Sequence, residues 1–237
     1  MKDFSLQLYS LRDIPTLKER LQIASDAGYT GVEFAGYEDY SAEELKSLLE
    51  SLSLRPVGTH VGINDENIEQ NLQYALELGL QHATIPGTEI ASNQEALEKA
   101  LLFDQYAEKF NKAGISFSYH NHAHEFAKDA DEYYLETMIK NTKHLQFELD
   151  VYWAAFADVD PVEFINRYAG RFSLIHFKEI AADKENVELG TGVLDFATIK
   201  AAAFAQGAKE IIVEQEHYTM EPAQSVVVDA QYMKTLS

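Results

Sequence analysis

The chain has no cysteine among its 237 residues. Disulfide bonds, thiolate ligands and a cysteine nucleophile are therefore excluded, and any metal site must be built from nitrogen and oxygen ligands. The sequence also has no apolar segment of the secretory type after Met1 and Lys2. We therefore expect a cytoplasmic location, with which the absence of cysteine is compatible.

Basic residues are scarce, with 19 Lys and Arg against 39 Asp and Glu, so the formal net charge is −20. A field of this sign repels phosphate backbones, and nucleic-acid binding relies on contacts from Lys and Arg. No run of about 20 apolar residues is present, so no segment is expected to span a membrane. We expect neither a nucleic acid nor a membrane as a partner, which leaves a small molecule. The chain could also form a homo-oligomer, which the composition neither predicts nor excludes.

A glycine-rich dinucleotide fingerprint is missing after the first predicted strand, where residues 9–13 read YSLRD. Eight segments have the alternation of strands: residues 4–9, 31–35, 54–60, 82–86, 115–120, 144–151, 172–178 and 210–215. Eight helical segments follow them in turn: residues 15–28, 41–51, 65–76, 92–111, 131–140, 161–170, 195–205 and 222–233. This alternation predicts an α/β protein with a single (β/α)8 TIM barrel, as one domain over residues 1–237. A doubly wound open sheet is the alternative.

The most informative stretch covers residues 115–125. Ile115, Phe117 and Tyr119 alternate with small polar residues and then with His120 and His122. This pattern predicts a strand with one apolar face and one polar face that ends in imidazoles. Strands of parallel sheets are usually apolar on both faces, so we interpret this strand as one that carries its histidines to a site. A histidine-rich surface loop is the alternative.

Other predicted strands carry polar side chains in the equivalent phase, near the carboxyl ends that form the catalytic rim of a barrel. With the fifth strand, the predicted inward set is Gln7, Glu33, His60, His120, Glu148, Asp150, His176, Lys178, Glu214 and Glu216. Carboxylates and imidazoles in this number are costly to bury without a compensating cation. The pattern therefore predicts a charged site at the rim.

Four of these residues come from four neighbouring strands: His120, Asp150, His176 and Glu214. Two imidazoles and two carboxylates suit one divalent ion (Mn²⁺, Mg²⁺, Co²⁺, Fe²⁺ or Zn²⁺) with open positions for water or a diol. Binding to such a site should weaken as the pH falls through the imidazole range. A polar network without metal is the alternative.

The chain resembles the xylose isomerase-like TIM-barrel family of sugar phosphate isomerases and epimerases. The resemblance rests on residues 6–12 (LQLYSLR), 31–36 (GVEFAG), 119–122 (YHNH), 148–153 (ELDVYW), 174–178 (LIHFK), 188–192 (ELGTG) and 213–215 (VEQ). The family's metal set is typically Glu, Asp, His and Glu from strands five to eight. The last three correspond to Asp150, His176 and Glu214. The first position holds His120 here, with Glu125 five residues later.

The resemblance implies a metal-dependent isomerase or epimerase of carbohydrate metabolism, acting on a small sugar or keto-sugar through an enediolate. It also implies that Glu214 is one of two residues that exchange protons with the substrate as acid and base. The second is His120, His122, Glu125 or Lys178. Because the usual first carboxylate is absent, a metal-dependent lyase or hydratase acting next to the ketone of a 3-keto sugar or oxidised glycoside is the alternative.

The predicted substrate-binding residues are Gln7, Glu33, His60, His122, Trp153 and Glu216, with Trp153 placed to stack on a sugar face. Lys178 is either a proton donor or the partner of an ion pair with Glu148 or Glu216. The scarcity of basic residues near the rim favours a neutral sugar. Apurinic-site endonucleases share this barrel, but they need a basic surface for DNA, which the charge of −20 opposes. A non-catalytic sugar-binding barrel is the remaining class.

Overall fold

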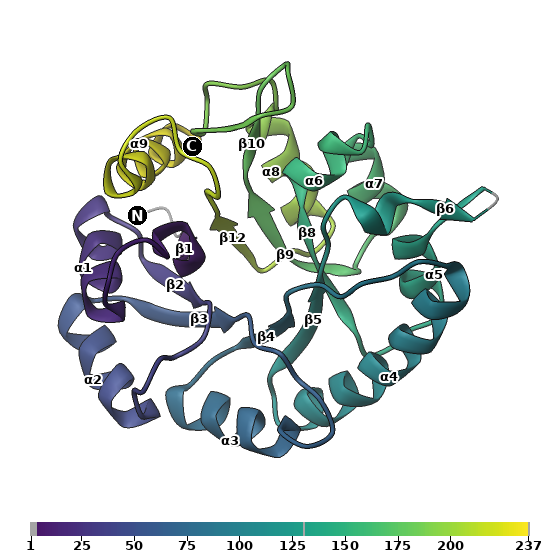
Figure 1. The fold of residues 1–237 in the computed structure, drawn as a ribbon, viewed down its shortest axis with the longest axis horizontal. Helices are drawn as coiled ribbons and strands as arrows, with labels where there is room; N and C mark the ends of the chain where they lie inside the picture. Colours follow the sequence, from purple (N-terminus) through teal and green to yellow (C-terminus); the bar gives the residue numbers. More distant parts are fainter. Residues whose placement is uncertain (1–3, 130, 237) are drawn as a thin grey trace.

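Eight parallel strands form a ring in the computed structural model, which describes residues 4–129 and 131–236 (Figure 1). The strands are β1 (Ser5–Gln7), β2 (Gly31–Phe34), β3 (Arg55–Thr59), β4 (His82–Ile85), β5 (Ser116–His120), β8 (Gln146–Asp150), β9 (Phe172–Phe177) and β12 (Glu210–Val213). They pair in the order β3-β2-β1-β12-β9-β8-β5-β4. One parallel bridge between His60 and Thr84 joins the two end strands, so the barrel is nearly closed. The predicted TIM barrel is confirmed.

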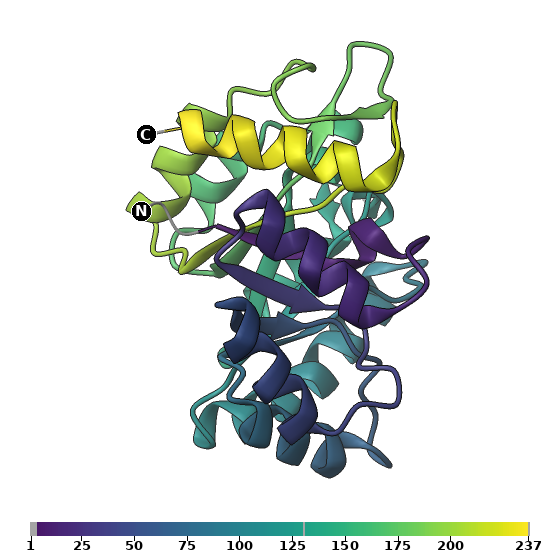
Figure 2. The ribbon, with the colours of Figure 1, turned by 90° about the vertical axis from the view of Figure 1, so that its left-hand side faces the viewer.

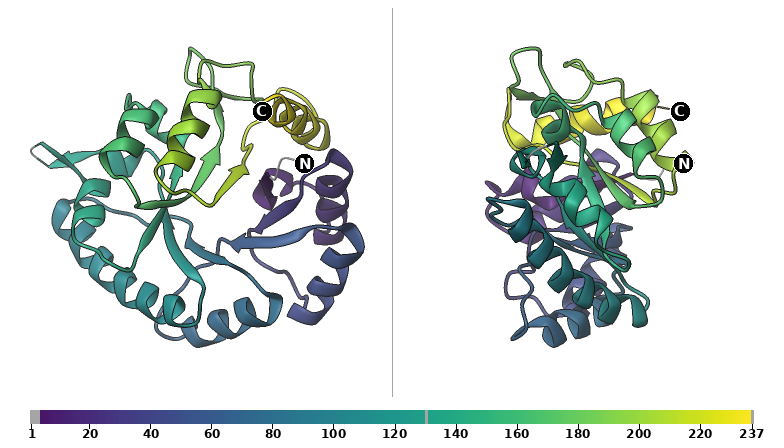
Figure 3. Two further views of the ribbon diagram at one scale, coloured as in Figure 1. Left: turned by 180° about the vertical axis from the view of Figure 1, so that it is seen from behind. Right: turned by 90° about the vertical axis from the view of Figure 1, so that its right-hand side faces the viewer.

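Helices cover the outside of this ring (Figures 1 and 3). They are α1 (Leu17–Ala27), α2 (Ala42–Leu52), α3 (Ile68–Leu78), α4 (Asn93–Lys112), α5 (Tyr134–Lys140), α6 (Val151–Phe156), α7 (Pro161–Arg167), α8 (Phe196–Ala205) and α9 (Pro222–Thr235), with 3-10 turns η1 (Leu8–Leu11) and η2 (His124–Phe126). Two short ribbons pair β6 (Lys128–Asp129) with β7 (Glu132–Tyr133) and β10 (Glu179–Ile180) with β11 (Asn186–Val187). The first and last helices, α1 and α9, lie side by side (Figure 2).

Two predicted helix starts are confirmed by their capping hydrogen bonds. At α2, Ser41 Oγ accepts from Glu44 N at 3.3 Å, and the Glu44 carboxylate accepts from Ser41 N at 2.9 Å. At α8, Asp195 Oδ1 accepts from Thr198 N at 3.1 Å. Each cap satisfies backbone N–H groups that the first turn of a helix leaves free.

Two other helix starts differ from the prediction. α3 begins at Ile68 rather than at residue 65, because Asn64 Oδ1 accepts from the backbone N–H of Glu66 and Asn67 and holds a turn there. α5 begins at Tyr134 rather than at residue 131, because residues 132–133 pair with residues 128–129. In both cases local hydrogen bonds compete with the first turn of the helix.

The buried face of α4 consists of small and aromatic side chains rather than of Leu101 and Leu102. Leu101 and Leu102 are 49% and 38% exposed, whereas Ala100, Phe103 and Ala107 face the barrel. Small and aromatic side chains allow this helix to approach the strands closely.

Among the residues that the structure describes, no helix is both long and apolar enough to cross a bilayer.

Asp229 on α9 gives the fold an expected pH dependence. Its side chain is fully buried, Oδ1 accepts from Leu189 N at 2.7 Å, and Oδ2 has no hydrogen-bond partner. Burial raises the pKa of Asp229 to about 8. The native state therefore keeps a proton that the unfolded chain releases near pH ~4, and stability is lost as the pH rises from there toward 8.

We expect Asp229→Asn to raise the free energy of unfolding by roughly 2–4 kcal/mol at pH 8 and by much less at pH 4, because the amide has no proton to lose. Urea denaturation at the two pH values measures the difference. Asp26→Asn, at an exposed position of α1, is the matched control. An equal gain at both pH values would contradict the explanation by a buried acid.

Candidate active site

A cavity of about 450 Å³ opens where the strands end. Its lining residues stand at the carboxyl ends of strands or directly after them: Tyr9, Ala35, His60, Pro86, His120, His122, Glu214 and Glu216. This is the rim at which barrel enzymes place their active sites. Imidazoles and carboxylates dominate the lining, and none of these residues is Lys or Arg.

The four predicted metal ligands lie together at this rim, and we call them the Asp150 group: His120, Asp150, His176 and Glu214. One ligand atom of each lies within 4.8 Å of the others. His120 Nε2 is 3.5 Å from Asp150 Oδ2, and His176 Nδ1 is 3.4 Å from Glu214 Oε2. Asp150 on β8 pairs directly with His176 on β9, so strand register sets these two side chains next to each other.

Several polar atoms of the Asp150 group have no hydrogen-bond partner. Both ring nitrogens of His120 and Oδ2 of Asp150 are buried and make no hydrogen bond. Burial lowers the pKa of His120 well below its usual range, and His176 and His60 add to the effect, so the ring is neutral and keeps a free lone pair. Unpaired buried donors and acceptors are costly. A divalent ion would supply the missing partner, so the group fits a metal.

Lys178 is fully buried next to this group. Its Nζ lies 2.8 Å from Glu216 Oε1, 3.8 Å from Glu214 Oε2 and 3.9 Å from Asp150 Oδ2. It also lies over the rings of Tyr152 and Trp153, 4.8 and 4.6 Å from the centroids. Burial alone would lower the pKa of Lys178, but Asp150, Glu214 and Glu216 outweigh it and raise the pKa. Lys178 therefore stays protonated and makes an ion pair with Glu216.

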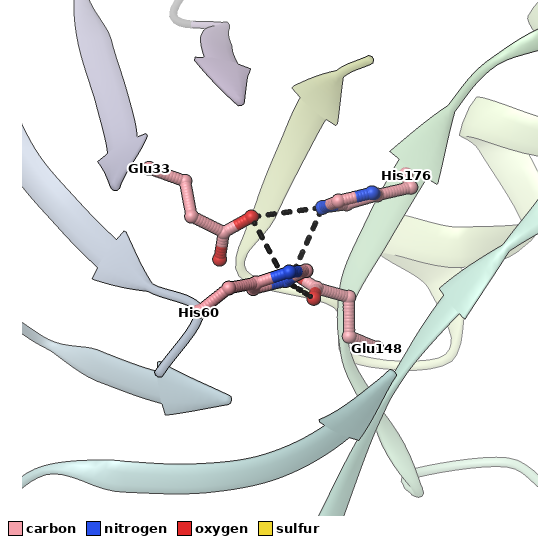
Figure 4. A group of neighbouring side chains, drawn as sticks. All are labelled: Glu33, His60, Glu148 and His176. Atoms are coloured by element: carbon pink, nitrogen blue, oxygen red, sulfur yellow. Dashed lines mark hydrogen bonds and ion pairs between the residues drawn. The ribbon is translucent and has the colours of Figure 1, made fainter. Parts of the chain in front are cut away.

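Four side chains form a second cluster inside the barrel, the Glu33 group: Glu33, His60, Glu148 and His176 (Figure 4). His176 Nε2 lies 2.8 Å from Glu33 Oε2 and 3.3 Å from Glu148 Oε1. His60 Nε2 lies 2.5 Å from Glu148 Oε2 and 3.3 Å from Glu33 Oε2. His176 thus belongs to both groups, with Nδ1 facing the Asp150 group and Nε2 facing the Glu33 group.

The predicted substrate-binding residues occupy three kinds of position. His60, His122 and Glu216 line the cavity. Trp153 and His122 line an adjoining cavity of about 640 Å³. Gln7 and Glu33 are fully buried and line neither cavity; Gln7 Nε2 donates to Glu33 Oε2 at 2.8 Å. These two residues support the site from within the barrel.

Glu125, the alternative fourth ligand, makes hydrogen bonds within its own loop instead of facing the predicted metal ligands. Its carboxylate accepts from Tyr119 Oη at 2.6 Å and from His122 N at 2.9 Å, and it groups with His122 and His124. The structure does not gather it with Asp150. These hydrogen bonds hold the loop after β5 in place and so aim His122 at the cavity.

Two residues of the site were not singled out from the sequence. Asn121 is buried, and its Oδ1 accepts from Asp150 N at 3.2 Å, which ties the ends of β5 and β8 together. Gly87 has φ +110°, and a Cβ there would lie 2.8 Å from His122 Nδ1, so only glycine leaves room for that ring. The Asn between two histidines and the Pro86–Gly87 turn after a strand were the available signals.

A parallel eight-stranded barrel with a candidate metal site at its catalytic rim defines the class of this protein. The sequence matches the family described as xylose isomerase-like TIM barrel over residues 21–236, and the chain belongs to this family. No curated protein matches the sequence.

Solved structures with the same fold include a sugar phosphate isomerase/epimerase from Parabacteroides distasonis, 26% identical, with a TM-score of 0.83 over 98% of this chain and 93% of that one. The probable 3-DHS dehydratase AsbF of Bacillus anthracis is 14% identical, with a TM-score of 0.78 over 98% and 99%. The IolI protein, whose structure holds a zinc atom, is 12% identical, with a TM-score of 0.76 over 99% and 98%. At 14% and 12% identity, the last two matches establish a shared fold and nothing about function.

Proposed function

We propose that this protein is a metal-dependent isomerase or epimerase that acts on a small sugar or keto-sugar through an enediolate. The observation that carries the proposal is the Asp150 group, whose mixed nitrogen and oxygen donors stand at the rim beside an open cavity and a buried lysine. The isomerase/epimerase from Parabacteroides distasonis supports it.

His120, Asp150, His176 and Glu214 would hold one divalent ion, with Mn²⁺, Mg²⁺, Co²⁺, Fe²⁺ and Zn²⁺ all compatible with these donors. The zinc atom in the IolI structure supports a metal at this kind of barrel. When bound, the ion would polarise a substrate carbonyl and offset the negative charge that develops on its oxygen.

Glu214 is the group best suited to remove a proton from carbon. Burial alone would raise its pKa, but Lys178 and His176 outweigh burial and lower it, so the carboxylate is ionised at neutral pH. It also lines the cavity. A carboxylate placed beside the substrate can accept the proton next to a carbonyl, which forms the enediolate.

Lys178 is the best proton donor among the candidates for the second acid/base. Its raised pKa keeps it charged, whereas burial lowers the pKa of His122 to about 3 and that of His120 well below its usual range. Neutral imidazoles can donate hydrogen bonds to substrate hydroxyls from the cavity wall. We assign Lys178 to protonation and His60, His122 and Glu216 to substrate binding.

A lyase or hydratase acting next to the ketone of a 3-keto sugar is the second candidate. The departure at His120 favours it, because a symmetric pair of metal-bound carboxylates that exchange protons on both faces is missing. The dehydratase with this fold supports it too. Such a reaction would use the same proton abstraction by Glu214 and then expel a leaving group with the help of Lys178.

Solvent deuterium exchange tests the proposal. The metal-loaded protein is incubated in D₂O with a panel of ketoses and keto-glycosides, each with and without phosphate, and the products are read by NMR. We expect deuterium at the carbon next to the carbonyl together with an isomer or epimer of a neutral sugar, because none of the described residues that line the cavity is Lys or Arg. Deuterium with loss of water or of an aglycone would select the lyase. Binding of a sugar without deuterium exchange would contradict the proposed reaction and support a non-catalytic sugar-binding barrel.

His120→Glu restores the residue that the family usually has at this position. We expect the variant to keep its metal, because the carboxylate is an anionic oxygen ligand, and to lose turnover about 100-fold, because it removes the N–H that an imidazole retains when its other nitrogen binds an ion. Equilibrium dialysis with Mn²⁺ and the exchange assay measure the two effects.

The pH below which the protein loses its metal should be the same in this variant as in the parent. His120 already has a low pKa, whereas Glu148, Glu214 and Glu33 outweigh burial and raise the pKa of His176. The proton on His176 therefore competes with the metal as the pH falls, in the variant as in the parent. Unchanged metal affinity together with unchanged turnover would contradict the assignment of His120.

A further inference from the structure

The Glu33 group brings ligands for a cation together on opposite walls of the barrel. Glu33 lies on β2, His60 follows β3, Glu148 lies on β8 and His176 lies on β9, and their side chains converge in Figure 4. One ligand atom from each lies within 4.8 Å of the others. All four are buried or nearly so, and the side chain of His60 is 10% exposed.

From this convergence we infer that the Glu33 group binds a second divalent cation, separate from the ion of the Asp150 group. The ion would be held by His60 Nε2, by one oxygen each of Glu33 and Glu148, and by His176 Nε2, whose ring would release its proton to solvent so that each of its two nitrogens faces one ion. This inference concerns cation binding alone and stands whether or not the proposed reaction is correct.

The distances suit a small ion of the zinc type. Ligands about 2.0–2.1 Å from a tetrahedral ion lie about 3.3 Å from one another. His60 Nε2 to Glu33 Oε2 and His176 Nε2 to Glu148 Oε1 are both 3.3 Å. The other two pairs, at 2.8 and 2.5 Å, are hydrogen bonds in this structure, and an ion would replace them. Glu148 Oε1 is buried, has no hydrogen bond and faces into the group.

The balance of charge in the interior also calls for a second cation. Five carboxylates face the rim and the space below it: Glu33, Glu148, Asp150, Glu214 and Glu216. Among the residues that the structure describes, Lys178 is the lysine buried with them. With His60 neutral and His176 deprotonated between the two groups, one divalent ion in the Asp150 group leaves three negative charges uncompensated. A second divalent ion compensates two of them, and buried charge without compensation is costly.

The structure also gives an ion access to the Glu33 group from solvent, and neighbouring residues position its ligands. His60 lines the open cavity, so an ion can reach its Nε2 from solvent. Gln7 donates to Glu33 at 2.8 Å and orients that carboxylate. Gly58 leaves the other side of Glu33 free, since a Cβ there would lie 2.9 Å from Glu33 Oε1.

Counting bound ions tests the inference. Protein stripped with a chelator is dialysed against Zn²⁺, and the zinc per chain is measured by plasma mass spectrometry. We expect two ions in the parent, one in His60→Gln, one in Asp150→Asn, and two in His82→Gln, a buried histidine that belongs to neither group. Circular dichroism checks that each variant is folded.

A parent that saturates at one ion, or a His60→Gln variant that still holds two, would overturn the inference, and protons would then supply the charge. Anomalous scattering from zinc-soaked crystals is the second measurement, with a peak expected between His60 and Glu148. Failure of every sugar to exchange deuterium would count against the proposed reaction but would leave the number of ions unchanged, so the two failures can be told apart.

Discussion

Replacing Glu214 by Gln should lower deuterium exchange next to the substrate carbonyl by roughly 10³-fold, because the amide cannot accept a proton. Glu214 follows β12, lines the cavity and lies 3.4 Å from His176 and 3.8 Å from Lys178. The change keeps the size of the side chain, so the barrel should fold as before. NMR of the substrate in D₂O measures the rate.

The metal content separates the two roles of this residue. His120, Asp150 and His176 remain in Glu214→Gln, so we expect metal binding to weaken while saturating Mn²⁺ still loads the site. The exchange rate must therefore be measured at saturating Mn²⁺. Glu89→Gln, an exposed carboxylate that lines the adjoining cavity, is the matched control and should exchange at the parent rate. Full exchange in Glu214→Gln at saturating metal would exclude Glu214 as the base.

His176→Ala should release the metal and abolish turnover. His176 contacts Glu214 through Nδ1 and Glu33 and Glu148 through Nε2, so its removal takes one ligand from the Asp150 group and leaves the carboxylates around it without their partner. We expect metal affinity to fall by more than about 100-fold. Equilibrium dialysis gives the affinity, and circular dichroism shows whether the barrel remains folded.

His82→Ala provides the matched control for this deletion. His82 is a buried histidine on β4 that belongs to neither group, and burial lowers its pKa to about 4. The loss of a buried ring should cost stability in both variants, but only His176→Ala should lose metal. If His176→Ala binds metal as tightly as the parent, the ligand assignment is wrong.

The alternation of strands and helices and the phase of the polar residues could be read from the sequence alone. Period-two alternation places Asp150, His176 and Glu214 on the inner face of their strands, and the carboxyl ends of parallel strands meet at one rim. That is why the sequence predicted the barrel and the four residues that the structure brings together. The starts of α2 and α8 could also be predicted from the sequence, because their caps depend on residues only three apart.

Loops and ring orientations were decided by the tertiary structure. Periodicity does not extend past the end of β5, so nothing in the sequence indicated that Glu125 would bond to Tyr119 and His122 instead of facing Asp150. Helix α6 begins directly after β8 because Asp150 Oδ1 accepts from Tyr152 N and Trp153 N, a contact that the strand pattern could not predict.

The two faces of His176 are the clearest case. Its position on β9 determined that the ring points inward, but only contacts from β2, β8 and the end of β12 decide that one nitrogen meets Glu33 and Glu148 and the other meets Glu214. Strand phase is a local property of a few residues, so the sequence by itself determines it. Which groups face each other across the barrel depends on how eight strands close into a ring, and only the folded chain decides that.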